Sequence, residues 1–150
     1  MVMPPCRAFV QNFYDFHVAH GSNFEKTFKL KRTALSLDLA NALAADLAAS
    51  RKNADEIVGL DFDPFTNSQD PSPKYRVENT NGDTGHCFAE VHGLPSDHKG
   101  KPDVTAELRF ANRSWRFVNF HYGRDNGPEN ENLLSILRTL KRDREKDHSK

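Results

Sequence analysis

Residues 74–93 read KYRVENTNGDTGHCFAEVHG, and this stretch decides the fold. Apolar and polar side chains alternate on both sides of the central TNGD, which is typical of β-strands. An Asn-Gly pair between two alternating runs predicts a hairpin with its turn at Asn81-Gly82. The period changes from helical to alternating after Pro73, so we expect helices before this point and strands after it.

The two strands predicted after the hairpin differ in how many of their faces are apolar. Residues 103–110 alternate strictly, with Val104, Ala106, Leu108 and Phe110 on one face, which predicts one dry side and one wet side. Asn112 and Arg113 form a predicted tight turn into the last strand, SWRFVNFHYG, residues 114–123.

The last predicted strand is apolar on both sides. Trp115 and Phe117 face one way, whereas Val118, Phe120 and Tyr122 face the other. This pattern predicts a central strand that is covered twice.

Helical spacing dominates the first half of the chain. Residues 5–20 form a predicted helix with a stripe of Phe9, Phe13 and Phe16, and Gly21 ends it. Residues 33–52 form a second predicted helix with a leucine at every fourth position and many alanines. A short third helix is expected at 53–58 with Asn53 as its N-cap.

A last helix is expected at 130–142, after the loop 124–132. The polar tail 143–150 is expected to fray. Helices followed by an antiparallel run of about four strands indicate a single α+β domain over residues 1–142.

Composition excludes several classes of function. Lys+Arg and Asp+Glu number 21 each in 150 residues, so the chain lacks the basic excess of a nucleic-acid-binding protein.

No apolar run is long enough to span a membrane, and the first residues lack the pattern of a signal peptide. The mature form of an exported protein would also lack a signal peptide, because the signal is removed. Cys6 and Cys87 are too few for a zinc ribbon and either pair as a disulfide or stay as two buried thiols.

The stretch GLDFDPFTNSQD, residues 59–70, carries the candidate motif residues Asp61, Asp63, Phe65, Gln69 and Asp70. It does not fit a calcium loop, because with Asp61 as the first ligand Phe65 occupies the fifth position. As a carboxylate pair, Asp61 and Asp63 would point to the same side about 7 Å apart, but no partner for such a pair is visible.

The third interpretation of this stretch is a corner between helix and sheet. Phe62 and Phe65 would anchor it in the core, and Pro64 would fix its direction. Asn67 and Asp70 would form Asx-type turns before the next proline. This interpretation uses every residue of the stretch, so we prefer it.

The segments FYDFHVAH, LDFDPFTNSQD and SWRFVNFHYG, together with the order of elements, resemble the nuclear transport factor 2-like superfamily, also called cystatin-like or SnoaL-like. Within it, they are similar to a small bacterial family of unknown function whose members are mostly exported to the periplasm. The resemblance implies a strongly curved sheet that wraps the helices into a cone, and it implies a periplasmic location.

Enzymes of that superfamily work inside the cone with an Asp or His base and a Tyr donor. The polar residues that would reach such a pocket here are Tyr14, Asp15, His17, Asn119 and His121. They match no catalytic pattern residue by residue, so no catalytic role, cofactor or metal is assigned.

We therefore expect a non-catalytic binding module for a protein partner or for a small apolar ligand in the cone. One alternative is a small cofactor-free isomerase, dehydratase or hydrolase with a His or Asp base. The other is a structural homodimer formed through the sheet face.

Overall fold

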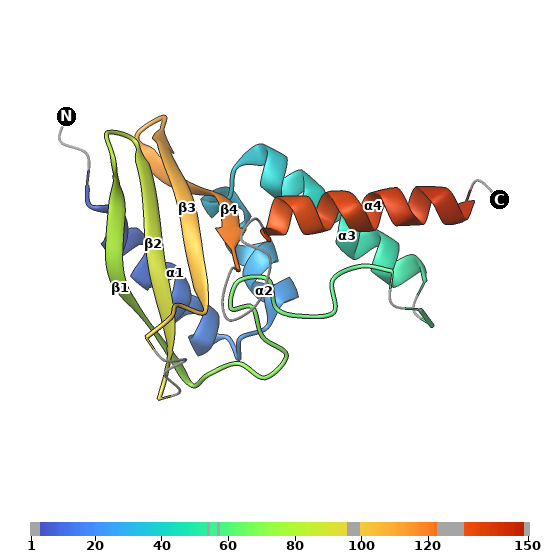
Figure 1. Ribbon diagram of the computed structural model, residues 1–150, viewed down its shortest axis with the longest axis horizontal. Helices are drawn as coiled ribbons and strands as arrows, with labels where there is room; N and C mark the ends of the chain where they lie inside the picture. Colours follow the sequence, from blue (N-terminus) through green and yellow to red (C-terminus); the bar gives the residue numbers. More distant parts are fainter. Residues whose placement is uncertain (1–3, 54, 57, 96–99, 123–130, 149–150) are drawn as a thin grey trace.

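The computed structural model describes residues 4–53, 55–56, 58–95, 100–122 and 131–148. Three α-helices and one 3-10 turn come first: α1 (Cys6–Ala19), α2 (Phe24–Leu30), η1 (Arg32–Ala34) and α3 (Leu37–Lys52). Four strands and a last helix follow: β1 (Lys74–Asp83), β2 (His86–Leu94), β3 (Val104–Ala111), β4 (Ser114–His121) and α4 (Leu133–His148). This order confirms the predicted α+β class (Figure 1).

The strands form one antiparallel sheet in the order β1-β2-β3-β4. The predicted hairpin is present, but its turn is not at Asn81-Gly82, which pair with β2 inside the ladder. The strands reverse at Thr84-Gly85, and Gly85 supplies the positive φ of 81° that such a short turn needs. Gly82 instead permits a close approach, because a Cβ there would lie 2.0 Å from the His86 carbonyl oxygen.

The prediction of a doubly covered central strand at 114–123 was wrong. β4 is the edge strand, and its ladder with β3 shifts register where Leu108 pairs with Phe117 and Glu107 with Asn119. This bulge leaves Val118 unmatched and changes the alternation. Trp115 and Phe117 before it, and Phe120 and Tyr122 after it, are therefore all buried.

The turn at Asn112 and Arg113 is confirmed, with φ values of 53° and 70°. The free edge of β4 is partly covered by the segment before α3. Leu35 forms a bridge with Phe117, and the Ser36 amide donates to the Phe117 carbonyl oxygen at 2.8 Å. This pairing blunts an edge that would otherwise be open to other strands.

Helix α1 packs on one face of the sheet, and its buried stripe is Cys6, Val10, Phe13, Tyr14 and His17. The predicted phenylalanine stripe is thus rotated, with only Phe13 at its centre. Side chains of α1 also bond the backbone of strand β1. Gln11 donates to the Tyr75 carbonyl and accepts from the Val77 amide, both at 2.9 Å.

The other helices differ in part from the prediction. Helix α2 was not anticipated, although Asn23 caps it by accepting from the Lys26 amide. No helix lies over the described part of 53–58, where Asn53 is instead the C-cap of α3. Helix α4 continues through His148 rather than ending at 142. The predicted loop 124–132 falls largely outside the described residues.

Within the described residues, none of the helices combines the length and the apolar character needed to cross a membrane.

Cys6 and Cys87 form a disulfide that joins the first turn of α1 to strand β2. The two cysteines are 81 residues apart in sequence, so the bond closes a long loop of the unfolded chain. Closing such a loop lowers the conformational entropy of the unfolded state.

We expect the double variant Cys6→Ala/Cys87→Ala to lose about 2–4 kcal/mol of unfolding free energy, because the unfolded chain regains the entropy of the open loop. Urea unfolding measures this loss. A reducing agent should destabilise the wild-type protein and leave the double variant unchanged. Equal stability of all forms, or two free thiols in the unreduced protein, would contradict the pairing.

Candidate functional site: a clamped corner

Residues 59–70 carry the chain from α3 toward β1, which confirms the interpretation of this stretch as a corner. Its beginning is held by Asp46 of α3, whose carboxylate accepts from the Leu60 amide at 2.8 Å and from Arg144 of α4 at 3.0 Å. Arg144 also donates to the Val58 carbonyl at 2.9 Å. Gly59 passes so close that a Cβ would lie 2.2 Å from the Ser50 hydroxyl.

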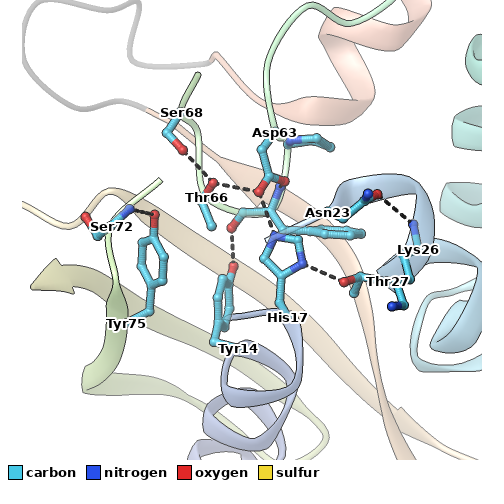
Figure 2. Close-up of polar contacts among 12 residues, drawn as sticks. Tyr14, His17, Asn23, Lys26, Thr27, Asp63, Thr66, Ser68, Ser72 and Tyr75 are labelled. Atoms are coloured by element: carbon cyan, nitrogen blue, oxygen red, sulfur yellow. Dashed lines mark hydrogen bonds and ion pairs between the residues drawn. The ribbon is translucent and has the colours of Figure 1, made fainter. Parts of the chain in front are cut away.

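Asp63 holds the centre of the corner (Figure 2). Its Oδ1 accepts from the Phe65 amide at 3.0 Å, and its Oδ2 accepts from the Thr66 hydroxyl at 2.9 Å. Its carbonyl accepts from the Asn67 amide at 2.8 Å, with Asn67 at a φ of 55°. The Asx-type turn thus belongs to Asp63, and within the described residues neither Asn67 nor Asp70 forms one.

His17 lies directly behind Asp63 and is completely buried in α1. Its Nε2 is 2.6 Å from Asp63 Oδ2, and its Nδ1 is 2.6 Å from Thr27 Oγ1 in α2. Because the carboxylate only accepts, Nε2–H donates to it, and Nδ1 either accepts from or donates to the Thr27 hydroxyl. One imidazole therefore joins three segments: α1, α2 and the corner.

Two tyrosines hold the corner from the core side. The Tyr14 hydroxyl donates to the Phe65 carbonyl, and the Tyr122 hydroxyl donates to the Pro64 carbonyl at 2.6 Å. Burial, and then the charge of Asp63, raises the pKa of Tyr14 well above its usual value. Burial followed by the neighbouring Tyr14 and Asp63 does the same to the pKa of Tyr122. Both phenols are therefore neutral hydrogen-bond donors at neutral pH.

Aromatic side chains fill the space between α1, the sheet and the corner. Phe65 contacts Phe13 and Phe120 with ring centroids 5.0 and 5.5 Å apart, and Phe13 contacts Phe117 at 4.7 Å. All four rings are at most 3% exposed. No buried side-chain nitrogen or oxygen of the described residues lacks a hydrogen-bond partner.

The five polar residues expected to reach a common pocket lie in different parts of the structure. Tyr14 and His17 meet Asp63 at the corner, as described above. Asn119 instead holds the start of α4, where its Oδ1 accepts from the Leu134 amide at 3.1 Å. His121 lies on the outer face of the sheet and contacts Glu107 at 2.9 Å. The structure therefore does not bring these residues together, and Asp15 lies exposed on α1.

The remaining motif residues lie at the surface. Asp61, Gln69 and Asp70 are exposed, and Gln69 donates to the Asp61 carbonyl at 3.2 Å. Asp61 and Gln69 border an open depression of about 720 Å³, whose lining also includes Asp63 and Glu25. The Asp63 side chain is 10% exposed there, but its oxygens already accept three hydrogen bonds. Asp70 lines a separate depression beside Pro95 and Asp103.

We call the hydrogen bonds of His17, Asp63, Tyr14 and Tyr122 that hold the corner the clamp. The sequence interpretation did not identify all of its members. Thr27, Thr66 and Tyr122 complete the set of hydrogen bonds that holds the corner. Tyr122 lies 58 residues from Pro64 in sequence, and the two threonines belong to no catalytic or binding pattern. The N-cap at Asn23 was the one signal that would have placed Thr27 on a helix next to α1.

A second polar cluster lies on the outer face of the sheet. Glu107 accepts from His86 and from His121, each at 2.9 Å, and the ring of Phe88 lies beside both histidines. Burial would raise the pKa of Glu107, but hydrogen bonds from His121 and His86 outweigh it, so the net effect lowers this pKa.

Across the described ranges, no group of three or more His, Cys, Asp or Glu side chains is arranged to hold a metal ion.

Comparison with family profiles, curated proteins and solved structures found no match for this chain.

We expect His17→Ala to lower the unfolding free energy by about 3 kcal/mol, because it leaves the largely buried Asp63 carboxylate without its main partner. His20→Ala, three residues later at the C-cap of α1, is the matched control. His20 is only half-buried and bonds within its own helix, so its loss should cost less than about 1 kcal/mol. Urea unfolding of both variants measures the difference, and equal costs would contradict a clamp at His17.

We expect the unfolding free energy of Glu107→Gln to fall less with decreasing pH than that of the wild-type protein. A carboxyl with a lowered folded-state pKa stabilises the protein above its ordinary pKa of 4.5, and this contribution is lost as the pH falls through the folded value. The wild-type protein should therefore lose stability more steeply than Glu107→Gln below that pH. Parallel unfolding profiles from pH 6 to pH 3 would contradict the role of the two histidines.

Proposed function

We propose that this protein is a non-catalytic binding module that recognises a protein partner through its surface. The observation that carries the proposal is the filled interior. Phe13, Phe65 and Phe117 occupy the space that a cone-bound ligand would need. The Tyr14 hydroxyl also holds the corner against this interior by a hydrogen bond to the Phe65 carbonyl.

A small apolar ligand in the cone receives less support from the same geometry. Such a ligand would have to displace packed aromatic rings and break the bonds of Tyr14 and Tyr122 to the corner. Each displaced ring would forfeit its buried contacts. The surface therefore remains as the place for recognition.

The second candidate is a small cofactor-free enzyme with Asp63 as general base. The partial exposure of Asp63 toward the open depression, with His17 behind it, favours this candidate. A carboxylate that already accepts bonds from His17, Thr66 and the Phe65 amide has little capacity left to take a substrate proton. The geometry supports a clamp better than a base.

A homodimer through the outer sheet face is the third candidate. That face carries half-exposed polar groups, including His86, Glu107 and the exposed Arg109. The core of a homodimer interface is usually depleted of charged residues. The composition of this face therefore gives little support to a dimer.

The compartment and the superfamily are also part of the proposal. A disulfide between Cys6 and Cys87 would persist in an oxidising compartment such as the periplasm, which agrees with the resemblance to exported proteins. A helix packed on a four-stranded antiparallel sheet also supports the resemblance to nuclear transport factor 2-like proteins.

We expect no thermal stabilisation by a panel of small apolar metabolites, because the interior is filled. We expect a monomer by light scattering, because the outer sheet face carries charged and polar groups. A ligand at a hundred times its Kd would add about 2.7 kcal/mol, which raises Tm by roughly 5 °C or more for a chain of this size. The proposal also predicts a protein partner. Crosslinking in cells of the source organism should identify it, and calorimetry with the purified partner should show binding at fixed stoichiometry. A Tm rise that Phe117→Ala alters, without any such partner, would contradict the proposal.

A further inference from the structure

A surface groove of about 710 Å³ lies between α2 with η1 on one side and α3 on the other. One wall carries Lys26, Lys29 and Arg32, which are spaced three residues apart. The opposite wall carries Ala44, Ala48 and Arg51. Phe28 of the core reaches the groove, but no residue of the corner 59–70 lines it, so the groove is separate from the corner.

The groove is strongly basic although the chain as a whole is neutral. Its lining holds four cationic side chains and a single carboxylate, Glu25, which Arg51 already pairs at 3.0 Å. Arg32 lies 5.2 Å from the centroid of the Phe28 ring. Lys26 and Lys29 have no acidic partner among the described residues, so the groove presents uncompensated positive charge.

Apolar side chains accompany this charge on α3. The helix face that begins with Leu37 also carries Ala44 and Ala48, interrupted by Asn41 and ending at Arg51, at intervals of three and four residues. Leu37 is 73% exposed at the start of this face. The two alanines leave room for another backbone to approach closely.

Leu30 lies one helical turn after Lys26 on α2 and is 54% exposed. Leu30 and Leu37 lie outside the lining of the groove, on the helices that form its two sides, whereas Leu47 lines the groove itself. Exposed leucines beside a basic groove can contact the apolar face of a bound amphipathic helix, whose apolar residues recur at spacings of three and four.

We propose that this groove is the docking site for an acidic amphipathic helix of the partner protein. The proposal rests on the proposed binding function and names its surface. Apolar residues of the partner helix contact Leu37, Ala44 and Ala48, and its carboxylates face Lys26, Lys29 and Arg32. A groove with charged walls encloses a helix on two sides, whereas a lipid surface would contact only the rims, so the geometry favours a protein segment.

The test uses a synthetic helical peptide of about 18 residues, long enough to form a helix on binding. Leucines occupy one face and glutamates the rest, and a control peptide replaces every glutamate with lysine. Fluorescence anisotropy should show saturable binding of the acidic peptide only, weakening as salt screens the charges. Amide NMR shifts should change along α2, η1 and α3.

Two variants locate the contact. Lys29→Glu/Arg32→Glu should weaken binding of the acidic peptide at least about tenfold, because both reversals place like charges together. The matched control, Lys74→Glu/Lys101→Glu, changes the net charge equally at two exposed positions outside the groove and should leave binding unchanged. Leu37→Ala should weaken binding about fivefold through the lost anchor.

Several outcomes would overturn the proposal. Equal binding of the acidic and basic peptides, an unchanged affinity of Lys29→Glu/Arg32→Glu, or no binding at all would each exclude the groove. Binding to phosphatidylserine vesicles in place of the peptide would assign it to membranes. A purified partner that binds wild-type protein and Lys29→Glu/Arg32→Glu equally would exclude the groove while leaving the proposed binding function in place.

Discussion

The buried pair of His17 and Asp63 is the interaction on which the rest of the structure depends. It joins α1, which covers the sheet, to the corner that links the helical half of the chain to the strands. Thr27 extends the same bond to α2. A buried imidazole and a largely buried carboxylate are costly to separate, because each would lose its partner without regaining full hydration. The corner is therefore held against α1 by polar bonds as well as by the insertion of Phe65.

This constraint determines where recognition can occur. With Tyr14 and Tyr122 bonded to the corner and Phe65 packed among other aromatic rings, the interior serves stability. Open depressions remain on the surface, and they differ in whether charged side chains without an opposite partner line them. The groove between α2 and α3 combines uncompensated cations with alanines and Leu47, and exposed leucines lie on the same helices, whereas the outer sheet face balances its carboxylates with histidines and an arginine. The groove is therefore the surface with the clearest chemical preference.

Much of the fold could be predicted from periodicity, because the change of period at Pro73 and the turn at Asn112 are local signals. The bulge at Val118 was not predictable, since an extra residue on one strand changes which side chains face inward without changing the composition. The turn at Thr84-Gly85 was missed because Asn81-Gly82 gave the stronger local signal, although Gly82 is needed for close packing. The corner was predictable from Phe65 and Pro64. The clamp was not, because His17 and Asp63 are 46 residues apart and meet only in the folded chain.

Native-state hydrogen exchange at the corner tests this account most directly. The amides of Asp63, Phe65 and Asn67 all donate within the corner. If the corner is a clamp over a filled interior, these amides should exchange as slowly as those of α1 and of the central strands, through global unfolding. Exchange that is much faster than that of α1, through a local opening that leaves the sheet protected, would contradict the account. The corner would then be a mobile lid, and the interior would again be a candidate site for ligands or catalysis.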